Sequence, residues 1–168
     1  MTLKDLEKKN ENINLDNYIE FREYVKLHME HPEWLGDFTK EDLETMIKTN
    51  SKIWIYYLNQ EEVCSMMLIP ATKEALEKFD INLDYNDVVD YGPMMVNPKF
   101  VGHGLQYQML QEIDKYSIKH NYKYAVGTIH PDNIYSIRNL LKDEFELVNY
   151  KEFKRGPRNI YMKKLTRN

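Results

Sequence analysis

Residues 94–107, MMVNPKFVGHGLQY, decide how this chain is expected to fold. The stretch ends an apolar strand, turns through a loop at Asn97–Gly104 and starts an amphipathic helix at Leu105. Two glycines in the loop, Gly102 and Gly104, let the backbone turn sharply and approach a ligand closely. The free N–H groups of the first helical turn and the helix dipole favour a bound anion, typically a phosphate. Taken alone, these residues are equally typical of an ordinary tight turn.

Two other phosphate-binding loops fit the same stretch poorly. The dinucleotide fingerprint G-x-G-x-x-G requires a third glycine for tight packing of the helix on the strand, and Tyr107 stands at that position. The loop also comes late in the chain and not in an opening strand–helix–strand unit. A Walker-type loop requires Gly-Lys-Ser/Thr, and no such sequence follows Gly104.

Hydrophobic periodicity on either side of this stretch predicts a mixed α/β fold. The expected helices cover residues 17–29, 39–49, 72–79, 105–120 and 133–142. The expected strands cover residues 52–58, 62–69, 87–96, 122–129, 145–150 and 159–165. Short loops join the first two strands and the last two as antiparallel hairpins, and one strand–helix–strand crossover lies between these hairpins.

Two segments of this outline have a less regular pattern. Residues 1–16 are expected to form a loose leader or a short edge strand, with Asp16 or Asn17 as the cap of the first helix. Gly92 and Pro93 interrupt the strand at 87–96, because both residues weaken a strand interior. A β-bulge or a close backbone approach is therefore expected there.

Length, charge and hydropathy narrow the class of protein. With 168 residues and a mass of 20.3 kDa, the chain is expected to form a single domain over residues 1–168. Its formal net charge of −4 weighs against a general nucleic-acid binder, which needs a basic surface. No apolar run approaches the roughly 18–20 residues of a membrane span, and the polar segment 1–14 lacks the apolar core of a secretion signal. A cytoplasmic protein that binds neither nucleic acid nor membranes is expected.

The potential metal ligands and one basic cluster are expected to be structural. Cys64 is the single cysteine, so it forms no internal disulfide, and its apolar neighbours indicate a core residue. His28 and His31 lack an acidic or cysteine partner, so no metal is expected. Basic residues also flank the last hairpin turn, where their charges are expected to be solvated: Lys151, Lys154, Arg155 and Arg158.

The segments that follow the loop favour one family. Val96-x-Pro98-x-Phe100-Val101-Gly102-His103-Gly104-Leu105 is followed by the strand at 122–129, by Asn133-x-x-Ser136 and by Phe145–Val148. This order resembles the Gcn5-related N-acetyltransferase (GNAT) family over residues 51–165, and the two N-terminal helices match it by position. The resemblance implies a GNAT-like mixed sheet with N-terminal helices, antiparallel strands and a central strand–loop–helix motif for acyl-CoA. It also implies acetyl transfer from acetyl-CoA to a primary amine of a small molecule or peptide by direct attack in a ternary complex.

The resemblance assigns a set of cofactor-binding residues. They are Met95, Val96, Val101, Gly102, His103, Gly104, Leu105, Gln106 and Asn133. Two residues of the loop depart from the family's Gln/Arg-x-x-Gly-x-Gly/Ala, because Val101 replaces the Gln or Arg and Gln106 replaces the small final residue. Backbone N–H groups bind phosphate whatever the side chains, so the phosphate-binding loop is expected to persist.

The catalytic residues are less well marked. In this fold the base often lies on the strand before the loop, which points to Asp90 as the acceptor of the amine proton, directly or through water. Backbone N–H groups near residues 94–96 would polarise the thioester carbonyl. The family's tyrosine, which protonates the departing thiolate, is replaced by Leu140, and Tyr135 is the substitute candidate. A thiol has an unperturbed pKa of about 8.5, so its thiolate leaves fairly well without an acid.

Several alternatives remain open at this level. The departures at Leu140, Val101 and Gln106 are compatible with a CoA-binding sensor or interaction module without turnover. A phosphate- or nucleotide-binding α/β protein unrelated to acyl transfer is a third interpretation. The N-terminal helices are expected to form a wall of the acceptor pocket, with Tyr18, His28, His31 and Trp34 on them. The resemblance is also compatible with a homodimer, and the acceptor amine is not identified.

Overall fold

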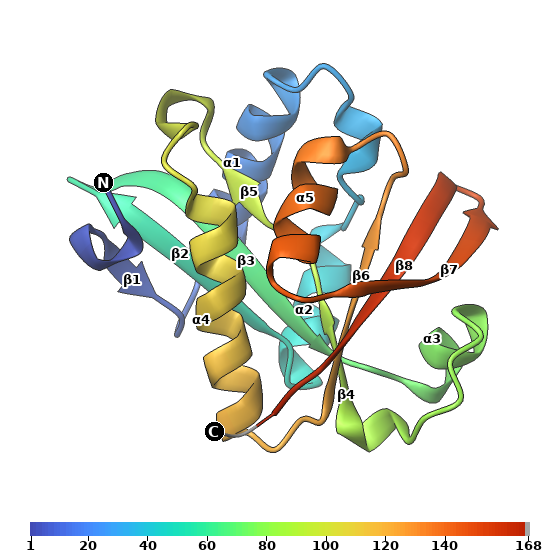
Figure 1. Ribbon diagram of the computed structural model, residues 1–168. Helices are drawn as coiled ribbons and strands as arrows, with labels where there is room; N and C mark the ends of the chain where they lie inside the picture. Colours follow the sequence, from blue (N-terminus) through green and yellow to red (C-terminus); the bar gives the residue numbers. More distant parts are fainter. Residues whose placement is uncertain (167–168) are drawn as a thin grey trace.

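The computed structural model describes residues 1–166 of the chain (Figure 1). The helices of these residues are α1 Leu15–Leu27, α2 Lys40–Lys48, α3 Lys73–Lys78, α4 Leu105–Lys119 and α5 Ile134–Lys142. The strands are β1 Glu7–Lys9, β2 Lys52–Leu58, β3 Glu61–Pro70, β4 Val88–Tyr91, β5 Met95–Val96, β6 Tyr124–Ile129, β7 Glu146–Phe153 and β8 Gly156–Lys164. Short 3-10 helices lie at Leu3–Asp5, Pro32–Trp34, Tyr85–Asp87 and Pro98–Phe100.

The strands form a single sheet in the order β1-β2-β3-β4-β6-β8-β7, and β5 pairs with β3 beside this path. Neighbouring strands are antiparallel except β4 and β6, which are parallel. The parallel pair requires a long crossover, and α4 provides it. The predicted mixed α/β fold is therefore confirmed.

Helices cover both faces of this sheet, with α4 in front of it in Figure 1 and α1 and α2 behind it. In β2, Trp54 and Tyr56 pack on the α4 side, whereas Ile53 and Ile55 pack on the side of α1 and α2. Successive strand side chains point to opposite faces, so a strand covered on both sides has a continuous apolar sequence. Cys64 of β3 is fully buried in the α4-side core, as predicted, and this burial raises its pKa to about 12.

The sheet splits where β4 ends. Leu68 of β3 pairs with Tyr91, and Ser65 of β3 pairs with Met95. The chain advances four residues from Tyr91 to Met95 but only three along β3, so one extra residue lies between β4 and β5. This is the β-bulge predicted at Gly92 and Pro93. Beyond the bulge β5 stays beside β3, whereas β6 continues beside β8. The parallel pairing of β4 with β6 ends at Asp90, and the two strands diverge from that point.

Glycine is required at the bulge because the chains approach closely there. The Gly92 N–H donates to the Met67 carbonyl oxygen at 2.9 Å. A Cβ atom at this position would lie 3.0 Å from Ile69 Cδ1 and 3.2 Å from Met67 Cβ. Gly92 therefore keeps the bulge against β3 and fixes the direction in which the chain leaves it.

Of the two alternatives predicted for residues 1–16, the structure shows the short edge strand, which covers Glu7–Lys9. β1 pairs with β2, and Leu3 is buried against the α4-side core. α1 begins earlier than predicted, because the cap is Asn14 and not Asp16 or Asn17. Asn14 Oδ1 accepts the Asn17 N–H at 3.1 Å. Throughout residues 1–166, every helix is too short or too polar to cross a membrane.

Candidate functional site

A loop with left-handed glycines precedes α4, as the sequence predicted. Gly102 has φ +90° and Gly104, the N-cap of α4, has φ +67°. Side chains rarely adopt this conformation, so both positions favour glycine. The N–H groups of residues 102–107 donate to no acceptor in the described part of the chain. They lie at the N-terminus of a 15-residue helix, where the helix dipole favours an anion.

The residue that supports this loop, Gln108, has no recognisable signal in the sequence. Gln108, in the first turn of α4, donates from Nε2 to the His103 carbonyl oxygen at 2.9 Å. Its Oε1 accepts the Leu3 N–H at 3.0 Å, which also fastens the N-terminal segment to α4. The side chains of Val101 and His103 are exposed, and the candidate anion site consists of the backbone N–H groups of the loop. The predicted cofactor roles of Val101 and His103 stay predictions.

A cavity of about 330 Å³ opens where β4 and β6 diverge. Pro93 and Met94 of the bulge form one side, and Gly127 to His130 of β6 and the residue after it form the other. Three residues of α5 and its cap also line the cavity, namely Asn133, Ser136 and Leu140. The split in the sheet therefore creates a site between the bulge and the first turn of α5.

Asp90 is the carboxylate of this cavity. It lies at the last position where β4 pairs with β6, between Ile69 of β3 and Val126 of β6, so its side chain starts where β4 and β6 separate. Burial raises its pKa to about 7, and the positive charge of Arg155 opposes part of this rise. A carboxyl with this pKa exchanges protons near neutral pH, which suits a general base.

Gln106 bridges α4 and α5 across one end of the cavity. Its Nε2 donates to Ser136 Oγ at 2.9 Å, and its Oε1 accepts from Asn139 Nδ2 at 2.7 Å. The side chain predicted to replace the family's small residue is thus engaged with α5. Its backbone N–H remains part of the candidate anion site. Asn133 caps α5 by accepting the Ser136 N–H at 3.3 Å.

The structure separates the two candidate catalytic residues. Asp90 lines the cavity, whereas Tyr135 is 59% exposed on α5 and is not among the lining residues. Leu140, at the position of the family's tyrosine, does line the cavity and is buried. Met95 is buried and pairs with β3, and Val96 follows it in the same pairing. The catalytic and cofactor roles of all these residues stay predictions.

An aromatic wall faces the bulge from the N-terminal half of the chain. Trp34 lines the cavity, and its ring stacks between His31, with centroids 4.4 Å apart, and His130, with centroids 5.2 Å apart. Of the other residues expected on this wall, Tyr18 is fully buried in the core and His28 is exposed. Trp34 is therefore the member of that set that lines the cavity.

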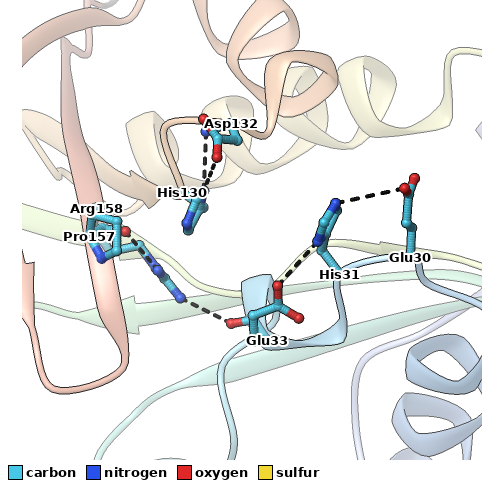
Figure 2. Close-up of polar contacts among 7 residues, drawn as sticks. All are labelled: Glu30, His31, Glu33, His130, Asp132, Pro157 and Arg158. Atoms are coloured by element: carbon cyan, nitrogen blue, oxygen red, sulfur yellow. Dashed lines mark hydrogen bonds and ion pairs between the residues drawn. The ribbon is translucent and has the colours of Figure 1, made fainter.

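The expectation of solvated charges at the last hairpin is wrong for Arg158. This side chain is only 1% exposed and lines the cavity together with Arg155. Figure 2 shows its guanidinium reaching the segment before Trp34, where Nη2 donates to the Glu33 carbonyl oxygen at 3.2 Å. Burial lowers the pKa of Arg158, and the nearby Arg155 lowers it further.

The described residues contain no cluster suited to a metal ion. Within residues 1–166, no three His, Cys, Asp or Glu side chains gather as a ligand set. The groups that line the cavity and can exchange a proton or carry a charge include the carboxyl of Asp90, the imidazole of His130 and the guanidinium groups of Arg155 and Arg158.

Comparison with known proteins identifies solved structures that have the same fold. No family model matches the sequence, and no curated protein matches it. Solved structures do match. An acetyltransferase of the GNAT family from Streptococcus pneumoniae has a TM-score of 0.68 and 13% identity, covering 95% of this chain and 100% of that one. YncA, a putative acetyltransferase from Salmonella typhimurium with its cofactor acetyl-CoA, has a TM-score of 0.68 and 13% identity, covering 96% and 95%.

A third similar structure contains ribostamycin together with coenzyme A. AAC(6')-Ib in complex with ribostamycin and coenzyme A has a TM-score of 0.70 and 16% identity, covering 94% of this chain and 93% of that one. At sequence identities of 13–16%, these similarities establish the fold of the chain over nearly its whole length. The chain has the fold of the GNAT N-acetyltransferases, as the order of its motifs predicted.

Proposed function

We propose that this protein is an acetyl-CoA-dependent N-acetyltransferase that acts on a primary amine of a small molecule. The observation that carries the proposal is Asp90, a carboxyl with a pKa of about 7, in a cavity formed at the bulge and closed by α5. The GNAT fold, shared with structures that contain acetyl-CoA or CoA, supports the choice of acyl donor.

The backbone between β5 and α4 fits the pyrophosphate of CoA. Six consecutive N–H groups, those of residues 102–107, have no acceptor within residues 1–166. Such groups at a helix N-terminus bind phosphate oxygens without help from side chains. We assign this loop to the diphosphate of the donor and the bulge to its thioester.

Transfer requires a neutral amine, because an ammonium ion has no lone pair. A free alkyl amine has a pKa near 10.4, so a base must take its proton as the amine attacks. In the proposed reaction the amine nitrogen forms a bond to the thioester carbonyl carbon, the carbon–sulfur bond breaks, and Asp90 receives the proton. The Met94 N–H, which has no acceptor in the described chain, would polarise the carbonyl oxygen.

The departing CoA thiolate does not require an acid from the protein. Its unperturbed pKa of about 8.5 makes it a fair leaving group near neutral pH, and it takes a proton from water after release. Leu140 lines the cavity at the position of the family's tyrosine, so the proposed mechanism omits that step. Tyr135, exposed on α5, stays a prediction that this mechanism does not use.

The same leucine favours a second candidate function, an acyl-CoA-binding sensor without turnover. Ligand-dependent thermal unfolding followed by a thiol-release assay separates the candidates. A ligand at 100 times its dissociation constant adds about 2.7 kcal/mol, which raises the melting temperature by several degrees. We expect this rise with acetyl-CoA and CoA but not with ATP or NAD, and thiol release when an amine is added.

Each other result has a definite meaning. Stabilisation by CoA with no thiol release from any amine would contradict the enzyme and favour the sensor. Stabilisation by ATP or NAD alone would contradict both and favour a nucleotide-binding protein.

The variant Lys119→Trp, changed at the far end of α4, is the matched control for any substitution in the loop.

A further inference from the structure

The charges that line the cavity are unbalanced. The chain as a whole has a formal net charge of −4, yet the charged side chains lining the cavity are Arg155, Arg158 and the single carboxyl of Asp90. Since Asp90 has a pKa of about 7, it carries only part of a negative charge at neutral pH. The charged residues that line the cavity therefore carry a net positive charge at neutral pH.

Neither arginine forms a close ion pair with a carboxylate of residues 1–166, although the charge of Arg155 acts on Asp90 and that of Glu33 acts on Arg158. Arg155 makes one hydrogen bond, from Nη2 to Thr128 Oγ1 at 3.3 Å, and no ion pair with a carboxylate of residues 1–166. The buried Arg158 donates only to two backbone carbonyl oxygens, at 2.7 Å to Pro157 and 3.2 Å to Glu33. A buried guanidinium without a carboxylate costs free energy, which a bound anion would offset.

The position of Arg155 suits a ligand in the cavity. It extends from the turn between β7 and β8 towards Gly36, where an added Cβ atom would lie 3.1 Å from its Nη1. Glycine at this position leaves space for the guanidinium beside the cavity, which Gly36 also lines. Arg155 thus keeps most of its donors available, and a guanidinium binds a planar carboxylate through two parallel hydrogen bonds.

We propose that the acceptor is a small amine that also carries an oxyanion, such as the carboxylate of an amino acid, and that Arg155 binds this anion. The proposal rests on the proposed function and names the substrate class of the same site. Arg158 lies beside Arg155 and adds positive charge from within the wall. Asp90 then receives the proton from the amine end of the molecule, and the stack of Trp34 on His130 limits its size.

The arrangement disfavours a polycationic acceptor. Aminoglycosides such as ribostamycin carry several amino groups, which are protonated in water at neutral pH. Two guanidinium groups opposite one partly ionised carboxyl would repel such a molecule. The ligand of the similar AAC(6')-Ib structure is therefore a useful contrast compound and not the expected acceptor.

Arg158 also has a structural role that the test must avoid. Its bond to the Glu33 carbonyl oxygen holds the segment that carries Trp34 (Figure 2), so its removal would disturb the wall itself. Arg155 is exposed, and its replacement is expected to leave the fold intact. The test variant is therefore Arg155→Gln, with Arg155→Lys as the charge-conserving second variant. Lys154→Gln is the matched control, because Lys154 is exposed on the same turn and does not line the cavity.

The turnover experiment compares each acid with its own amide, and the values of kcat/KM are expressed per neutral amine, because the amide also has the lower amine pKa. Thiol release is measured with acetyl-CoA and glycine, β-alanine, 4-aminobutyrate and leucine, each beside its amide, with 2-aminoethylphosphonate and ribostamycin as further compounds. We expect the best acid to exceed its amide at least tenfold in kcat/KM. In Arg155→Gln, KM for this acid rises about 10- to 100-fold, as expected for loss of hydrogen bonds to a charged group. KM for acetyl-CoA and the activity of Lys154→Gln stay unchanged.

The phosphonate decides which oxyanion the site takes. A preference for 2-aminoethylphosphonate over every carboxylate would assign a phosphate-like group, and the reverse would assign a carboxylate. Both results support an anionic acceptor. Equal use of acids and amides, faster use of ribostamycin, or a rise in KM for acetyl-CoA in Arg155→Gln would overturn it.

A binding measurement keeps the inference testable if the proposed function fails. With CoA present, the preferred acid is expected to raise the melting temperature of the wild-type protein more than its amide does. This difference should vanish in Arg155→Gln and persist in Lys154→Gln. No thiol release from any compound would contradict the acetyltransferase. Equal stabilisation by acids and amides would contradict the anion site.

Discussion

Replacing Asp90 by Asn is the sharpest test of the proposed base, because its effect depends on pH in a defined way. With a pKa of about 7, the ionised fraction of Asp90 is about one tenth at pH 6 and about nine tenths at pH 8. The amine substrate is mostly protonated at both pH values, and its small neutral fraction changes equally for both proteins. The ratio of kcat/KM between wild type and Asp90→Asn removes this shared contribution and isolates Asp90.

The expected ratio follows from these fractions. General base catalysis contributes about 10²–10⁴-fold, so Asp90→Asn should lose about this much activity at pH 8. The ratio should fall by about tenfold between pH 8 and pH 6, because the wild type loses its base there. Thiol release with the best acceptor, at subsaturating amine, measures both values. A ratio that does not change with pH would refute the assignment of Asp90 as the base.

Stability gives a second measurement of the same pKa without any substrate. Folding raises the pKa of Asp90 from 3.8 to about 7, so the folded state holds the proton more tightly than the unfolded state. The protonated carboxyl of Asp90 adds to the free energy of unfolding. This contribution is complete below about pH 3.8 and is lost as the pH rises to about 7. The asparagine variant does not titrate, so its stability relative to wild type should increase across this window.

The expected change in stability between wild type and Asp90→Asn has an upper limit. A pKa change from 3.8 to about 7 corresponds to about 4 kcal/mol. The side chain opens onto the cavity, where solvent screening reduces the cost of its ionised form, so about 1–3 kcal/mol is expected. A change of this size in the free energy of unfolding shifts the melting temperature by several degrees, at roughly 2–4 °C per kcal/mol. Melting curves at pH 4.5 and 7.5 compare the two proteins, and an unchanged difference would show that burial does not perturb Asp90.

Three further substitutions test the surrounding structure. Gly104→Trp should abolish stabilisation by CoA while the protein stays folded, since an indole at φ +67° blocks the exposed loop; retained affinity would refute the loop assignment. Trp34→Ala should raise KM for the acceptor and leave KM for acetyl-CoA unchanged, and the opposite pattern would place the donor on this wall. Lys163→Met should destabilise the fold by about 3–5 kcal/mol, because Lys163 Nζ lies 2.6 Å from Asp114 and 3.3 Å from Asp143, both buried. Burial and Asp114 raise the pKa of Asp143 to about 8, so Asp143 is ionised at pH 9 and mostly protonated at pH 6. The loss of unfolding free energy in Lys163→Met should therefore be greater at pH 9 than at pH 6, and urea unfolding at both pH values measures it.

Local patterns in the sequence predict most of the fold. The apolar run of β2, the paired glycines before α4 and the interruption at Gly92 each reflect a requirement of nearby backbone, so a sequence pattern reveals them. The edge strand β1 has only three exposed residues and no apolar alternation. Its place depends on pairing with β2 about fifty residues later, and so the sequence leaves it undecided.

The site is harder to predict because distant segments meet there. Asp90 is identifiable by its place on the strand before the loop, but its pKa depends on how β6 and the bulge enclose it. Arg158 lies among charged residues at a hairpin, a pattern typical of solvent exposure. It is buried because Glu33, 125 residues away, places a carbonyl oxygen within reach of its guanidinium. No local pattern encodes such a contact.

The buried thiol of Cys64 has a practical consequence for measuring the reaction. Acetyl transfer is followed by the appearance of free CoA sulfhydryl, and any reactive cysteine of the enzyme would consume the same reagent. Cys64 is sealed in the core, and its pKa of about 12 leaves almost no thiolate at neutral pH. The folded protein is therefore silent in such a colorimetric assay, and colour from the protein itself reports molecules that have unfolded.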